Sequence, residues 1–412
     1  MKTIAKIYIS LALFSCFWAS IAQAQTSFEE DSVFHFAGYA DIGYGLVQGG
    51  GEDFLSAKFA PIIHYQYQDW FLFEAEGEFD FEDAGATEKS SALEYASMNF
   101  FLNDNLTIGV GKYLSPVGQF VQNLHPSWIN KLPTMPLGFA GGHHGSSATP
   151  NNDFGIQARG GFETGDTSRM NYAIMVGNGP ELIVEELEDG DLIIEGLDLP
   201  AKFDDANSDK AIGGRLGFLP IPNLEFGISF ETADAAFASI RPADAHVDDG
   251  HGDEGDTHVE EGDQHADEGD THTDEGDDHG EEEDDHSGSL IRDRSYKVFS
   301  FDFYFAPTKI KNLILRGEFA STKLGQGRED EYDHDKKRWE AWYAQASYFF
   351  PDQKIETVAR YGNFSPAGGE KSKQLSLGLN YVLKSNSVLK AAYEFNNGSS
   401  GDRALFQYAY GF

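Results

Sequence analysis

Polar and hydrophobic residues alternate with a period of two along most of the chain. The clearest case is 71–82, where Phe dominates one phase and Glu and Asp occupy most of the other. Because successive side chains of a strand point to opposite faces, this segment is predicted to be a strand with one aromatic and one anionic face. The alternation returns in eight further segments: 154–162, 170–176, 212–218, 224–230, 297–305, 313–319, 375–381 and 404–412. Segments of about ten residues separated by turn residues are typical of a transmembrane β-barrel.

The connections between these segments decide the fold class, since a β-sandwich also alternates. Tight turns are predicted at 69–70, 103–105, 165–168, 219–223, 306–311, 350–353 and 384–387. Longer loops are predicted at 48–52, 83–90, 116–150, 179–210, 234–294, 323–337, 363–371 and 396–402. Alternating short turns and long loops predict an all-β, antiparallel transmembrane barrel of about 16 strands, with short periplasmic turns and long extracellular loops.

Composition favours strands over helices as the membrane-crossing elements. The chain has 33 Phe, 18 Tyr and 5 Trp, enough for two interfacial aromatic girdles. Lys2 and Lys6 precede an apolar run at 7–21 and small residues at 22–24, which predicts a signal peptide at 1–24 and a barrel domain at 25–412. The one cysteine, Cys16, lies within that signal, so we expect neither disulfides nor thiolate metal sites.

If the aromatic phase of each strand faces lipid, the other phase lines the lumen. The pore-lining residues predicted by this rule are Glu74, Glu76, Glu78, Asp80, Arg159, Arg215, Arg316 and Arg360. Acids and arginines that face each other across the lumen would produce a transverse field that orients hydrated solutes. In the alternative interpretation they neutralise one another as ordinary ion pairs.

The third predicted loop, 116–150, is rich in proline, aromatic residues and histidine. We expect this loop to fold into the pore as a constriction, which would bring His125, His143 and His144 to the channel. His143 and His144 would then form a way-station for a cation, together with other ligands, because two adjacent histidines do not complete a metal site. The alternative is a glycine-rich loop tip.

A tract at 244–287 repeats a seven-residue unit that ends in histidine. Its regular copies are GDEGDTH, VEEGDQH, ADEGDTH, TDEGDDH and GEEEDDH. From residue 244 to residue 286 there are 21 acidic residues and seven of the 13 histidines, with no Lys or Arg. Because the tract lacks the two apolar positions per heptad of a coiled coil, we predict a disordered, self-repelling loop.

Imidazole combined with carboxylate suits Zn²⁺ and other divalent transition metals better than Ca²⁺ or Mg²⁺. The expected ligands are His246, His251, His258, His265, His272, His279, His286, Asp256, Asp263, Asp270, Asp277 and Asp284. Seven extended residues reach about 23 Å, so we expect several weak, exchanging sites. Metal binding needs the neutral ring, so capture should weaken below neutral pH. The alternative is an acidic loop that only aids solubility.

The even strand number, the long third loop and a last strand, 403–412, that ends in Phe412 together resemble Gram-negative outer-membrane porins. The segment 111–118, GKYLSPVG, is similar to the phosphate-selective type, and the His/Asp-rich loop is similar to those of outer-membrane zinc receptors. The resemblance implies a location in the outer membrane of a Gram-negative bacterium, contact with its lipid, and a homotrimer as the usual assembly. It also implies insertion by the barrel-assembly machinery through the strand ending in Phe412.

The leading hypothesis is a passive outer-membrane channel that captures divalent transition metal, preferably zinc, on its fifth outer loop. Zinc would be bound cargo, and no cofactor is expected for folding. A general or anion-selective solute porin remains the alternative, although a net charge of -38 opposes phosphate selectivity and a nucleic-acid partner. A non-conducting metal buffer is a further alternative. An enzyme is not expected, since no local motif supplies a nucleophile with its base.

Overall fold

The computed structural model describes residues 31–48, 52–81, 90–139, 147–187, 190–199, 207–241, 291–329, 331–397 and 401–412. The strands are β1 (Ser32–Val47), β2 (Glu52–Tyr67), β3 (Phe71–Asp80), β4 (Ser90–Asn103), β5 (Leu106–Leu114), β6 (Asn152–Glu163), β7 (Arg169–Gly177), β8 (Glu181–Glu186), β9 (Leu192–Asp198), β10 (Ala211–Ile221), β11 (Leu224–Arg241), β12 (Arg294–Phe305), β13 (Leu313–Leu324), β14 (Lys337–Phe350), β15 (Ile355–Ser365), β16 (Ser372–Lys384), β17 (Ser387–Asn397) and β18 (Arg403–Gly411). A short helix, α2, spans Phe120–Leu124.

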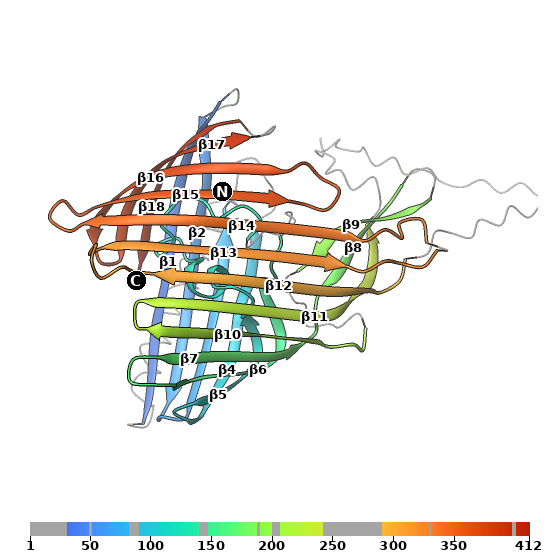
Figure 1. The fold of residues 1–412 in the computed structure, drawn as a ribbon, viewed down its shortest axis with the longest axis horizontal. Helices are drawn as coiled ribbons and strands as arrows, with labels where there is room; N and C mark the ends of the chain where they lie inside the picture. Colours follow the sequence, from blue (N-terminus) through green and yellow to red (C-terminus); the bar gives the residue numbers. More distant parts are fainter. Residues whose placement is uncertain are drawn as a thin grey trace, which may run out of the picture.

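The strands form a closed barrel (Figure 1). Eighteen strands hydrogen-bond in one sheet, and sixteen of them, all except β8 and β9, make up the barrel wall. Neighbours along the chain pair antiparallel, β7 pairs with β10, and β18 pairs with β1 to complete the circle. The predicted antiparallel barrel of about 16 strands is therefore confirmed.

Short turns and long loops lie at opposite ends of the barrel, as their alternation along the sequence predicts. The structure differs in where some strands end. The strand β11 continues to Arg241, so the connection predicted to begin at residue 234 begins only after Arg241. In the part of the chain that the structure describes, no helix has both the length and the apolar character needed to cross a membrane.

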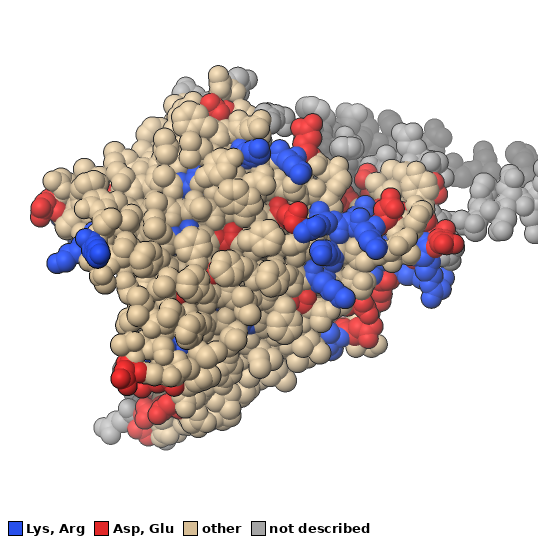
Figure 2. Space-filling model, viewed as in Figure 1, with Lys and Arg blue, Asp and Glu red and all other residues tan. Residues whose placement is uncertain are grey.

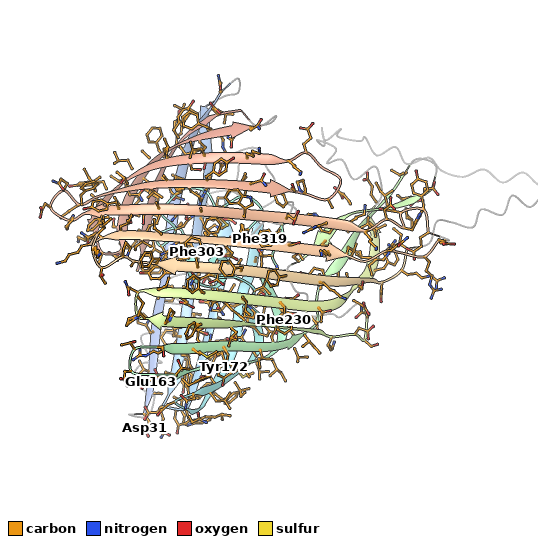
Figure 3. All side chains as sticks on the ribbon, viewed as in Figure 1. Asp31, Glu163, Tyr172, Phe230, Phe303 and Phe319 are labelled. Atoms are coloured by element: carbon orange, nitrogen blue, oxygen red, sulfur yellow. The ribbon has the colours of Figure 1, made fainter. Side chains whose placement is uncertain are left out.

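The outer face of the barrel is apolar across its middle. Phe230 on β11 and Phe299 on β12 are more than half exposed, and Figure 3 labels Phe230, Phe303 and Phe319 on neighbouring strands. Charged side chains gather mainly toward the two ends of the visible face (Figure 2). Burying one such aromatic side chain in hydrocarbon is worth about 1.5–3 kcal/mol, so this surface is suited to a lipid surround.

A hairpin, β8–β9, extends from the fourth loop at the loop end of the barrel (Figure 1). The sequence of this segment mixes acidic with aliphatic residues and predicts only an outer-loop structure without metal ligands. The structure shows why the residues alternate: Leu182, Val184 and Ile194 are buried. They belong to an apolar cluster that also contains Tyr296 and Trp339 of the barrel wall. The hairpin is thus fastened to the inside of the β12–β14 wall.

Candidate functional site

The segment between β5 and β6 lies inside the barrel and is fastened first near α2. On β13, Glu318 Oε2 accepts hydrogen bonds from Gln119 N at 3.2 Å and Phe120 N at 3.0 Å. Gly118 has a φ of +80°, and a Cβ there would lie 1.7 Å from Glu318 Oε1. Only glycine therefore lets the carboxylate reach the start of the helix.

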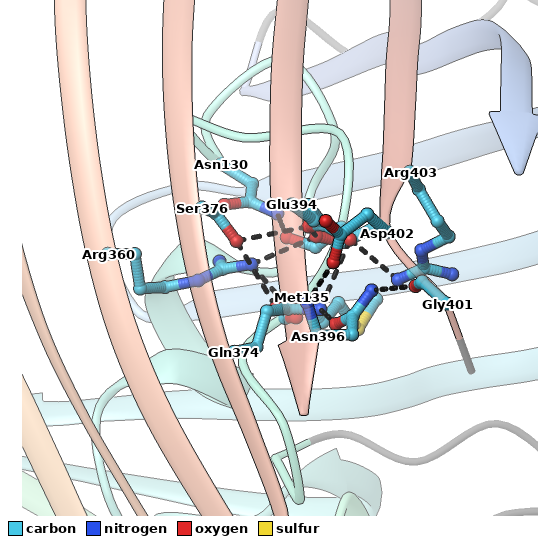
Figure 4. A network of polar contacts seen from close by, with 11 residues as sticks. Asn130, Met135, Arg360, Gln374, Ser376, Glu394, Asn396, Gly401, Asp402 and Arg403 are labelled. Atoms are coloured by element: carbon cyan, nitrogen blue, oxygen red, sulfur yellow. Dashed lines mark hydrogen bonds and ion pairs between the residues drawn. The ribbon is translucent and has the colours of Figure 1, made fainter. Parts of the chain in front are cut away.

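A second fastening lies on β15 to β17, around Glu394 (Figure 4). Arg360 Nη2 donates to Thr134 Oγ1 and to Met135 O, both at 3.0 Å. Thr134 also donates to Glu394, which accepts from Arg403 Nη2 at 2.6 Å. Arg360 is 2% exposed and Glu394 is fully buried. The Arg360 and Glu394 side chains therefore hold the loop and are not exposed to solvent in the channel.

A third fastening lies nearer the turn end, on β16 and β17. Lys390 Nζ donates to Ser127 O, and Asn380 Nδ2 donates to Lys131 O at 2.8 Å. Lys131 Nζ in turn lies 3.2 Å from Glu356 Oε1. Since all three fastenings lie on β13 to β17, the loop is held against that side of the barrel.

The opposite side of the barrel stays open beside the loop. A cavity of about 770 Å³ runs between the loop and the wall formed by β3 to β7 with β10 and β11. Its charged wall residues include Glu74, Glu76, Arg159 and Arg215, and His125 faces it from the loop. The cavity is the candidate path for a solute.

The predicted pore residues on this wall pair with their neighbours. Arg159 Nη2 lies 3.6 Å from Glu74 Oε1, and Glu78 and Asp80 lie 2.5 Å and 3.6 Å from Lys58 Nζ. Lys58 and its acids lie on the adjacent strands β2 and β3, whereas Arg159 on β6 reaches Glu74 on β3 along the same wall. Both are ion-pair arrangements. These acids and cations do not oppose each other across the lumen.

The other predicted arginines differ in their surroundings. Arg215 makes two hydrogen bonds to the Asp302 carboxylate, at 2.6 Å and 2.9 Å, and one to Glu225 at 2.9 Å. The Arg316 guanidinium carbon lies 5.6 Å from the centre of the Tyr304 ring. Arg360 is covered by the loop, as described above. Arg159 and Arg215 thus line the cavity within ion pairs. Arg316 lies against an aromatic ring, and Arg360 holds the loop.

His125 follows α2 and has an unusual environment. Its Nδ1 donates to Val121 O at 2.5 Å, and its Nε2 lies 3.9 Å from Glu76 Oε1, without a hydrogen-bond partner. Burial by itself would lower the pKa of His125, but the Glu76 carboxylate, assisted by Glu94, raises it above the usual range. His125 therefore keeps a proton to higher pH than an exposed histidine does.

The residues predicted to bind metal lie outside the described part of the chain. These are His143 and His144 of the third loop and every His and Asp predicted in the tract at 244–287. Among the described residues, no group of three or more His, Cys, Asp or Glu side chains stands at metal-binding spacing. The predicted capture of metal on the tract stays a prediction.

Several polar residues of the interior were not singled out from the sequence. Lys58 and Asp302 occupy the inward phase of their strands, so the alternation rule could have found them. Glu394 and Lys390 also follow the rule, but their role depends on the path of the loop. No signal in the sequence predicts that path.

A closed sixteen-stranded antiparallel barrel with a loop folded inside is the fold of outer-membrane porins. The chain is similar to the anion-selective porin from Comamonas acidovorans, with a TM-score of 0.54 and 10% identity over 92% of this chain and 100% of that one. It is also similar to OmpF of Salmonella typhi, solved with daunomycin, with a TM-score of 0.53 and 11% identity over 93% and 99% of the two chains.

In-vitro folded OmpT, an outer membrane protein of Vibrio cholerae, gives a TM-score of 0.52 at 12% identity, over 94% of this chain and 99% of that one. The sequence matches no protein-family profile and no curated protein. At such low identities the likeness shows the shared fold alone.

Proposed function

We propose that this chain is a passive channel for small hydrophilic solutes in the outer membrane of a Gram-negative bacterium. The observation that carries the proposal is the open cavity of about 770 Å³ beside an inward loop that is fastened to the other side of the barrel. The fold shared with solved porins and the apolar outer face support the membrane setting. The proposal contains no catalytic step.

The charges of the cavity favour cations over anions. Its lining presents three acids, Glu74, Glu76 and Glu225, against Arg159 and Arg215, and His125 adds a positive charge only while it is protonated. The whole chain carries a formal charge of -38. Such a lumen attracts cations and slows anions. The likeness of 111–118 to phosphate-selective porins therefore does not extend, in this proposal, to anion selectivity.

Planar bilayers test this proposal. The purified chain should give a stable ohmic conductance, and in a KCl gradient the reversal potential should take the sign expected for K⁺. The substitution Glu74→Gln should reduce that preference, whereas Glu163→Gln should leave it unchanged, because the Glu163 side chain is 76% exposed near a turn. Absence of conductance would refute the channel. A preference for Cl⁻ would favour the anion-selective alternative.

A second candidate function adds capture of divalent transition metal, preferably zinc, by the tract between β11 and β12. The observation that favours it is the constant spacing of seven residues from His251 to His286 within an acidic sequence. Loops rich in His and Asp are also found in outer-membrane zinc receptors, the likeness noted from the sequence. In this proposal the tract concentrates zinc as cargo at the loop end of the channel, and transport runs down a gradient.

Zinc flux into proteoliposomes tests the role of the tract. The intact chain is compared with one that lacks residues 246–286, at neutral and at mildly acidic pH. Capture predicts that deletion lowers flux at low zinc and leaves saturated flux and KCl conductance unchanged, with a smaller difference at acidic pH. Equal zinc flux through both chains would leave a general porin with a solubilising acidic loop.

The proposal also includes how the protein reaches and occupies the membrane. The expected signal peptide at 1–24, insertion by the barrel-assembly machinery through the strand ending in Phe412, and a homotrimer all follow from the porin likeness. Crosslinking of the protein in native outer membranes, followed by denaturing electrophoresis, tests the trimer.

A further inference from the structure

Histidines gather on one wall of the lumen. The structure describes His35, His64, His125 and His334. His64 and His125 each face one of two successive inward carboxylates of β3, and His35 stacks on His64. His64 Nε2 lies 3.9 Å from Glu74 Oε2, and His125 Nε2 lies 3.9 Å from Glu76 Oε1. Two imidazole–carboxylate pairs therefore follow each other at a spacing of about 7 Å along the strand.

The His64–Glu74 pair, which lies nearer the turn end, has a second imidazole beside it. His35 on β1 is the cross-strand partner of His64 on β2, and His64 is the partner of Glu74 on β3. The two rings are parallel within 3°, with centroids 5.9 Å apart. Glu74 uses Oε1 for Asn99 and Arg159, while Oε2 is the atom nearest to His64. Two imidazoles and a carboxylate oxygen thus share one row across three strands.

The pair at the loop is oriented by its own hydrogen bonds. Because Nδ1 of His125 donates to Val121 O, Nε2 is the nitrogen that faces Glu76 and the one that loses its proton when the ring becomes neutral. That Nε2 is buried without a partner, and Glu76 is fixed by the hydroxyl of Tyr39 at 2.9 Å. A backbone bond on the far ring nitrogen is how metal-binding histidines are commonly held.

The distances fit an ion better than a direct hydrogen bond. Tetrahedral metal bonds of about 2.0–2.2 Å place a nitrogen and an oxygen ligand about 3.4 Å apart. The imidazole nitrogen and carboxylate oxygen of each pair would therefore move about half an ångström closer together to bind an ion. Imidazole with carboxylate is the donor set of borderline divalent transition metals, while Ca²⁺ and Mg²⁺ prefer oxygen alone.

We infer that the β3 wall carries two transit steps for a divalent transition cation, His125 with Glu76 and then His64 with Glu74. Each step offers one imidazole nitrogen and one carboxylate as protein donors, so binding is weak enough for release, as conduction requires. Glu74, Glu76 and His125 line the open cavity, which places the steps on the solute path. The inference rests on the proposed channel function and names the class of cation that the lumen accepts.

Zinc block of single-channel K⁺ current tests this inference. The chain lacking residues 246–286 is used, so that the tract does not bind the metal. Zn²⁺ should reduce the current at concentrations where Ca²⁺ has little effect. His64→Gln and His125→Gln should each raise the half-blocking zinc concentration about tenfold or more. His334→Gln is the matched control and should change nothing, because His334 lies in the loop between β13 and β14.

Two results would overturn the inference: no block by millimolar Zn²⁺, or equal block of the parent and of both glutamine variants. His64 is 34% exposed, so its variant is expected to fold even if the buried His125 variant does not. If the parent chain conducts no KCl, the channel proposal fails, and Co²⁺ absorption on the refolded barrel decides the site separately. Cobalt binding that His64→Gln weakens would support the site, and absence of binding would refute it.

Discussion

Arg360→Met should loosen the inward loop without changing the ions that the channel prefers. Methionine has a similar length and an apolar side chain, so the substitution removes both hydrogen bonds, to Thr134 and to Met135, with little loss of packing. The alternation of the strand predicts Arg360 as a pore-lining charge. Its burial under the loop, at 2% exposure, makes it a fastening instead.

The size of the effect follows from two opposing contributions. Hydrogen bonds from a charged donor are worth about 1.5–3 kcal/mol each, so the two bonds contribute about 3–6 kcal/mol. Removing a buried charge also recovers part of its desolvation cost, and Nη1 of Arg360 is buried without a partner. We expect a net loss of about 1–3 kcal/mol, which multiplies the population of the detached loop about 5- to 150-fold.

Single-channel recording measures this effect as the frequency of transient conductance steps. The main open level and the reversal potential of the Arg360→Met protein should match those of the parent, because Glu318 and Lys390 still hold the loop. Arg159→Met is the matched control, since Arg159 lines the open cavity. It should shift the reversal potential and leave the step frequency unchanged. A shifted reversal potential in Arg360→Met, with no added steps, would refute the fastening role.

Three further predictions concern pH, stability and backbone strain. Neighbouring carboxylates raise the pKa of His125, so the lumen should lose a positive charge as pH rises past the range in which an exposed histidine titrates, and cation preference should increase. This rise should be absent in His125→Gln, and an identical rise in that variant would contradict the prediction. Asp302→Asn leaves the Arg215 charge with one partner and should lower the free energy of unfolding by about 3 kcal/mol, seen as a lower urea midpoint. Gly118→Ala should displace the Glu318 carboxylate and raise the frequency of conductance steps, and an unchanged trace would show that the strain is relieved elsewhere.

The barrel could be predicted from the sequence because the lipid-facing phase imposes a regular signal. Aromatic residues at alternate positions located the strands, and turn residues located their connections, so the strand number agrees with the structure. The signal fades where a strand leaves the apolar zone: Ala233, Ala235 and Ala236 carry no lipid-facing character, although β11 continues past them. The β8–β9 hairpin lacks aromatic residues for a similar reason, since its apolar face packs inside.

The candidate site could be predicted only in part, because the direction in which a side chain points and the residues that surround it have different causes. The pleat of a strand sets the direction of a side chain, and this placed Glu74 and Arg159 in the interior. The residues that an inward side chain contacts depend on the path of the loop between β5 and β6. That loop is held by residues distant in sequence, such as Glu318, which binds Phe120 N. The pairing of His35 with His64 depends on the register of two strands, which alternation leaves open.

The pairing of β1 with β18 gives the barrel a seam. Other neighbours in the wall are joined by a turn or a loop, whereas this pairing aligns Tyr39 with Gly411 and Val47 with Arg403. Hairpins between sequence neighbours form from short-range encounters, but the seam must bring together segments separated by nearly the whole chain. Until it forms, two unsatisfied strand edges remain open to pairing with other molecules. The time the chain spends vulnerable to aggregation is therefore governed by one non-local encounter.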